Sequence, residues 1–226
     1  MTKTILLASV AALALSVGGA SAAGHHPATS AKMTSSKASF KGANRALSVL
    51  YDQNDDSQGY ADVSQNFESS FDVYDAQGAD DFVVPDGSVW AIKEVDTTGL
   101  YFNGFGLARD ENVTFYKVTK KGGLKQVATF TVAGNDDGAG NFTIDLGKGA
   151  KLKKGHYYVS VQANMDFSVG GEWGWATRNT QANDPALWQN PGDGFATGCT
   201  SWANERDCLG DVAGPDHMFT LRGRSR

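Results

Sequence analysis

Apolar and polar residues alternate along several short runs of this chain. Phe142, Ile144 and Leu146 fall on one face of an extended backbone, because side chains in a strand point to opposite faces in turn. The runs 113–119 and 157–163 are rich in the β-branched and aromatic residues that favour strands. The pattern therefore predicts half-buried strands, and no helical periodicity lies between them.

Turn-forming residues separate these runs. Pro85-Asp86-Gly87 predicts a β-turn after a strand at 80–84, and the Lys-Lys-Gly-Gly sequence at 120–123 predicts a hairpin between strands at 113–119 and 124–132. Roughly nine strands at intervals of about 8 to 15 residues result, which is typical of a sandwich. We predict an all-β fold, an antiparallel two-sheet sandwich of Greek-key or jelly-roll type, over residues 51–226.

Four segments of the chain carry a family resemblance. They have the sequences DFVVPDG at 81–87, VTFY at 113–116, YVSVQANM at 158–165 and GPDHMF at 214–219. Together they resemble a recurrent β-sandwich module of bacterial secreted and cell-surface proteins, and the likeness covers about residues 67–223. That family has no settled activity and no established catalytic residues, so the resemblance implies a fold and export from the cell but no reaction.

The first 22 residues have the pattern of an export signal. Lys3 precedes an apolar run at 5–17, and small residues then lead to Ala20-Ser21-Ala22. The run is shorter than the ~20 residues of a membrane span, and Ala-x-Ala is typical of signal-peptidase cleavage. We predict a signal peptide at 1–22, a flexible N-terminal segment at 23–50, and a secreted or periplasmic protein without a membrane span.

The composition agrees with one folded domain. Hydrophobic residues make up 41% of the 226 residues, which is enough for a core, and 27 glycines agree with many turns. The formal net charge of -5 provides no broad basic surface, so we expect no nucleic-acid partner.

The only two cysteines lie close together in the sequence. Disulfides form in oxidising compartments, so Cys199 and Cys208 of an exported protein predict a disulfide rather than a metal site. The bridge closes a short loop that contains Trp202, and loop closure of this length contributes about 2.5 to 3 kcal/mol. We expect it to fix the shape of that loop.

Aromatic and amide side chains are concentrated between residues 172 and 202. A sugar ring stacks its C–H face on an aromatic ring, and its hydroxyl groups need polar partners nearby. We therefore predict a non-enzymatic binding protein for an extracellular glycan or cell-surface component. The predicted ligand-binding residues are Trp173, Trp175, Arg178, Trp188, Asn190 and Trp202. The alternative for each tryptophan is a place in the core or a role in anchoring a loop.

Two other functions stay open at this point. The chain has only four histidines, His25, His26, His156 and His217, and no linear motif of a nucleophilic hydrolase, so no catalytic residue is assigned. A hydrolase built on paired carboxylates is one alternative, with Glu172 the first residue to test. A self-associating extracellular structural protein with exposed sheet edges is the other.

Two segments are candidates for a metal ion. Asp52, Asp55 and Asp56 form an oxygen-rich cluster, which is what calcium prefers, so they are the predicted ligands of a structural calcium ion. Cleavage after Ala22 would also leave the N-terminal sequence Ala-Gly-His, which ends at His25 and matches a square-planar copper or nickel site.

Overall fold

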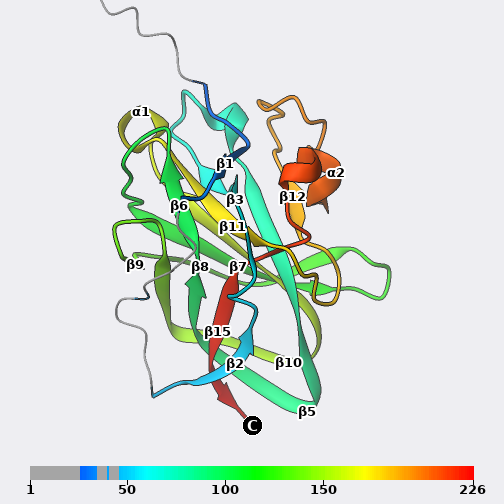
Figure 1. Cartoon of the computed structure of the whole chain (residues 1–226). Helices are drawn as coiled ribbons and strands as arrows, with labels where there is room; N and C mark the ends of the chain where they lie inside the picture. Colours follow the sequence, from blue (N-terminus) through cyan, green and yellow to red (C-terminus); the bar gives the residue numbers. More distant parts are fainter. Residues whose placement is uncertain (1–25, 35–39, 41–45) are drawn as a thin grey trace, which may run out of the picture.

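A computed structural model describes residues 26–34, 40 and 46–226 (Figure 1). Strands account for 55% and helices for 8%, and two antiparallel sheets pack as a sandwich, so the predicted fold class is confirmed. The predicted signal peptide and the copper motif at 23–25 lie outside the described residues.

The larger sheet runs across the middle of the molecule. Its main path follows the order β13 (Ala203–Asn204), β12 (Leu187–Gln189), β5 (Gln77–Thr97), β10 (Phe142–Asn164), β7 (Asp110–Val118) and β8 (Leu124–Val132). Shorter strands pair beside this path: β15 (Phe219–Ser225), β2 (Ser48–Asp52), β4 (Gln65–Asn66) and β9 (Asn135–Asp136). The hairpin predicted at 113–132 is confirmed as β7 and β8.

The smaller sheet covers one face of the larger one. Its members are β1 (Ser30–Lys32), β3 (Ser57–Val63), β11 (Glu172–Arg178), β14 (Asp216–His217) and β6 (Gly99–Phe102). The helices are single turns: η1 (Asp72–Tyr74), α1 (Phe167–Gly170), α2 (Glu205–Leu209) and η2 (Gly210–Val212). Because β1 pairs with β3 and β2 begins at Ser48, parts of the segment predicted as flexible belong to the sheets.

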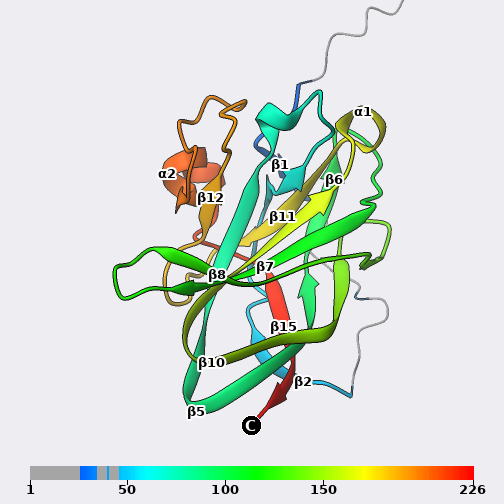
Figure 2. The same cartoon turned by 180° about the vertical axis from the view of Figure 1, so that it is seen from behind.

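The turn predicted at Pro85-Asp86-Gly87 is a bulge inside one long strand. Val84 pairs with Gly155 of β10 and Val89 with Lys153, so residues 85–88 stand opposite a single residue of β10. Extra residues of this kind bend a strand without ending its pairing. Figure 2 shows β5 and β10 side by side down to the lower end of the molecule.

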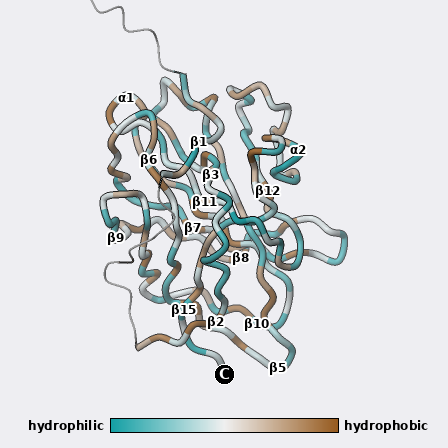
Figure 3. The backbone as a smooth tube through the Cα atoms, viewed as in Figure 1, coloured by the Kyte–Doolittle hydropathy of each residue, from teal (hydrophilic) through white to brown (hydrophobic). Residues whose placement is uncertain are grey.

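The core lies between the two sheets. Hydrophobic and hydrophilic residues follow one another along the strands in Figure 3, as expected for a layer with one buried face. The largest fully buried apolar side chains of this core include Phe82, Phe115, Phe142, Ile92 and Phe219. Burying one such side chain contributes about 1.5 to 3 kcal/mol, so this layer is the main source of stability.

Candidate functional site

Three of the predicted ligand-binding tryptophans are buried. Trp173, Trp175 and Trp188 have no exposed surface. Each indole Nε1 donates a hydrogen bond of 2.8 to 2.9 Å to a backbone carbonyl: those of Gly140, Met218 and Val63, respectively. Every residue of β11 is buried, so the shared face of Trp173 and Trp175 points into the sandwich. The three rings therefore take the buried positions that the sequence analysis gave as the alternative to ligand binding.

Arg178 and Asn190 also hold the fold together. The Arg178 guanidinium is 2.7 Å from an Asp55 carboxylate oxygen and 3.6 Å from Asp216, and the residue is 7% exposed. Asn190 is fully buried and donates from Nδ2 to the carbonyl oxygen of Val73 at 2.8 Å. The structure thus gives both side chains contacts within the fold, and their predicted role in ligand binding stays a prediction.

The carboxylates predicted to bind calcium turn to different partners. Asp52 accepts a hydrogen bond from the Thr220 hydroxyl at 2.8 Å, and Asp56 accepts one from Thr180 at 2.5 Å. Asp55 is held by the guanidinium described above. The structure therefore does not bring these three residues together around a single ion.

The predicted disulfide is confirmed. The loop that it closes contains Trp202, the one tryptophan among the predicted ligand-binding residues whose ring has exposed surface. Cys199 and Cys208 are bonded, with their Cα atoms 5.9 Å apart. Between them, Trp202 is partly exposed and packs edge-on against Tyr116, with the ring centroids 5.6 Å apart. The disulfide loop thus fixes one aromatic ring at the surface.

A groove of about 420 Å³ lies beside this ring. The tip of the β7–β8 hairpin lines it, together with Tyr158 of β10, Asp184, Leu187 and residues 202–204. Figures 1 and 2 both show the hairpin and the unit of β12 and α2 projecting from the same side of the molecule. The groove is therefore bounded by two extensions of the sandwich rather than by its core.

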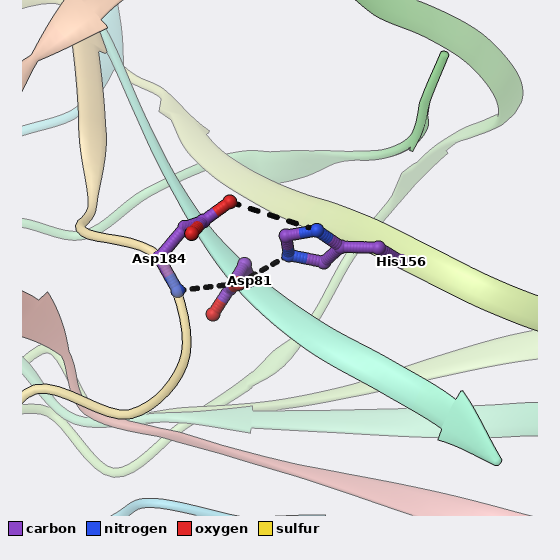
Figure 4. Close-up of side chains that lie close together, drawn as sticks. All are labelled: Asp81, His156 and Asp184. Carbon is purple, nitrogen blue, oxygen red and sulfur yellow. Dashed lines mark hydrogen bonds and ion pairs between the residues drawn. The ribbon is translucent and has the colours of Figure 1, made fainter. Parts of the chain in front are cut away.

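A histidine lies between two carboxylates at the edge of this groove (Figure 4). His156 Nε2 forms a hydrogen bond with Asp81 Oδ2, and its Nδ1 is 3.6 Å from Asp184 Oδ2. One donor atom from each residue lies within 4.8 Å of the other two. The side chains of Asp81, His156 and Asp184 are 0%, 27% and 63% exposed, so this open cluster runs from the interior to solvent.

Strand register brings two members of the open cluster together. Asp81 of β5 pairs with Tyr158 of β10, and His156 lies two residues before Tyr158 on the same face of β10. Diagonal neighbours of this kind are within reach of long side chains. Val83, on that face of β5, is 43% exposed, so the face points away from the core.

The loop before β12 supplies the third member. Asn183 adopts a left-handed backbone with φ of 61°, a conformation that Asn tolerates better than most residues. The next residue, Asp184, then donates its backbone N–H to Asp81 Oδ2 at 3.0 Å, and Asn183 Nδ2 donates to Asp81 Oδ1 at 3.3 Å. Both carboxylate oxygens of the buried Asp81 are therefore held in place by hydrogen bonds.

The surroundings of the open cluster are strongly acidic. Burial raises the pKa of Asp81, while hydrogen bonds from Asp184, His156 and Asn183 oppose that shift. Its fully buried neighbour Asp80 has a pKa raised well above the usual range, chiefly by burial and then by the charge of Asp216. Several carboxyl groups thus share a small volume, and a cation placed there would be stabilised.

The residue first considered for hydrolysis holds the N-terminal segment in place. Glu172 is fully buried, and its two oxygens accept hydrogen bonds from Ala28 N at 2.8 Å and from Asn103 Nδ2 at 2.7 Å. Burial raises the pKa of Glu172 to about 8.

No helix in the described part of the chain has the length and apolar character needed to traverse a bilayer.

Comparisons with known proteins assign no family to this architecture. No protein-family model matches the chain, and no significantly similar curated protein was found.

Proposed function

We propose that this is an extracytoplasmic, non-enzymatic binding protein whose groove holds a glycan or another hydroxyl-rich component of a cell envelope. The observation that carries the proposal is the partly exposed indole of Trp202 in the wall of a groove of about 420 Å³. The volume lies within the range of about 300 to 1,000 Å³ that is usual for ligand pockets.

The chemistry of the groove supports a sugar as the ligand. An indole offers an apolar face for the C–H groups of a sugar ring, and the Trp202 ring is fixed by its contact with Tyr116. Asp184 and Asn204 add a carboxylate and a carboxamide to the lining, and both groups bond readily to hydroxyls. One apolar face next to polar groups is the combination that sugar recognition requires.

The disulfide and the N-terminal pattern support the location. A disulfide persists in oxidising compartments such as the periplasm or the outside of the cell. The basic start, short apolar run and Ala-x-Ala of residues 1–22 support export through a signal peptide.

A glycan array tests the proposal directly. Wild type should bind a subset of polysaccharides, and Trp202→Ala should weaken that binding by about tenfold, because loss of the ring removes its buried apolar area together with a stacking contribution of about 0.5 to 1.5 kcal/mol. Phe105→Ala is the matched control, since this ring is 96% exposed and does not line the groove. Equal binding by wild type and Trp202→Ala would contradict the proposal.

A further inference from the structure

The open cluster combines the donor types of a transition-metal site. Asp81 and Asp184 offer carboxylate oxygens and His156 an imidazole nitrogen, with one donor from each inside a 4.8 Å limit. Two ligands at tetrahedral positions about 2.1 Å from Zn²⁺ are about 3.4 Å apart. His156 Nδ1 and Asp184 Oδ2 are 3.6 Å apart, and the exposed Asp184 side chain is free to adjust.

We infer that Asp81, His156 and Asp184 bind one divalent transition-metal ion, with Zn²⁺ the preferred ion. This inference does not depend on the proposed glycan. Imidazole suits zinc and its neighbours in the first transition row, whereas calcium takes six to eight oxygen ligands. Three protein ligands leave the fourth position of a tetrahedral ion for water or an outside ligand.

The hydrogen bonds around Asp81 prepare it for an ion. Asn183 and the backbone of Asp184 fix both of its oxygens, as outer-sphere donors do in metal sites. The His156 ring packs beside Tyr158, with the centroids 5.7 Å apart, which restricts its orientation.

The position of Asp184 connects the ion to the groove. Asp184 belongs to the cluster and also lines the groove beside Trp202. Within the described ranges, no other trio of His, Cys, Asp or Glu residues brings its donor atoms this close together. The open coordination position therefore lies where an outside ligand has access.

Isothermal titration calorimetry with ZnCl₂ alone tests the inference on the full chain made without a histidine tag. We expect one ion per chain at neutral pH. His156→Ala and Asp184→Asn should each weaken binding by at least about tenfold. Asn183→Ala, a positioning residue, should weaken it by about tenfold, since loss of outer-sphere partners costs about 10- to 100-fold.

Two controls separate this site from other binding. Asp86→Asn removes a carboxylate that is 88% exposed and lies outside the cluster. A second variant, His25→Ala combined with His26→Ala, removes the N-terminal histidines. Both proteins should bind Zn²⁺ like wild type. Asp184 is exposed, so Asp184→Asn should keep the melting temperature of the ion-free protein. Unchanged affinity in His156→Ala and Asp184→Asn, loss only with the N-terminal histidines, or tighter binding of Ca²⁺ than of Zn²⁺ would each overturn the inference.

Discussion

Two clusters in this protein each contain one histidine and two carboxyl groups, and they differ in their access to solvent. The open cluster, at the edge of the groove, consists of Asp81, His156 and Asp184. The sealed cluster lies between the two sheets and consists of Asp62, Glu205 and His217, each with no exposed surface. In the open cluster both oxygens of the buried Asp81 accept hydrogen bonds, whereas no oxygen of Asp62 or Glu205 has a hydrogen-bond partner within the described structure.

The sealed cluster is held by packing and charge. His217 Nε2 is 3.2 Å from Glu205 Oε1, and its ring stacks on that of Trp175 with the centroids 4.4 Å apart. Burial, together with the charge of Glu205, raises the pKa of Asp62 well above its usual range. The two clusters differ in accessibility: of the two, the open cluster alone combines converging donor atoms with access from solvent.

The largest difference should appear when each histidine is removed. His217→Ala removes the side chain that lies 3.2 Å from the buried carboxyl group of Glu205, and breaking a buried pair in this way costs about 3 to 5 kcal/mol of unfolding free energy. His156→Ala should cost only about 1.5 to 3 kcal/mol, the range for a hydrogen bond to a charged group, because Asp81 keeps its bonds to Asn183 and Asp184. Urea unfolding measures both, and equal losses would remove the distinction between the clusters.

The disulfide connects the two regions and should have the next largest effect. The loop between Cys199 and Cys208 carries Trp202 on the groove side and Glu205 in the sealed cluster. Replacing both cysteines by Ser should lower the free energy of unfolding by about 2.5 to 3 kcal/mol, through the entropy of the unfolded chain. Thermal unfolding of the double variant checks this. An unchanged melting temperature would mean that packing alone fixes the loop.

The sequence was sufficient for the fold class, the β7–β8 hairpin and the disulfide. These features depend on local alternation, turn residues and the presence of only two cysteines. The sequence could not predict whether Trp173 and Trp175 point into the core. A spacing of two residues places both rings on one face of the strand, but it does not say which face meets the other sheet. Their burial follows from the place of β11 between β3 and β6, a property of the whole topology.

The open cluster was missed for a similar reason. Asp81 and His156 meet through the register of β5 and β10, and a loop turn at Asn183 adds Asp184. Strand register between distant segments is not visible in a single sequence. One local signal was present: Asp80-Asp81 precedes the apolar residues 82–84, and adjacent residues of a strand must direct one carboxylate to each face of the sheet.

The smallest of the expected effects concerns pH. Because the folded pKa of Asp62 is raised, the folded state keeps a proton that the unfolded chain loses above the ordinary aspartate value of 3.8. The stability of wild type should therefore fall as the pH rises above about 4, and Asp62→Asn should reduce that fall. Melting temperatures measured at pH 4 and pH 8 give the change of stability with pH for wild type and for Asp62→Asn. Equal slopes would show that Asp62 ionises freely in the folded protein.

Anomalous diffraction at the zinc absorption edge tests the difference between the clusters most directly. Crystals of the full chain grown with Zn²⁺ should show a peak among Asp81, His156 and Asp184, with no peak at Glu205 and His217. A peak at the sealed cluster, or none at the open cluster, would contradict the account.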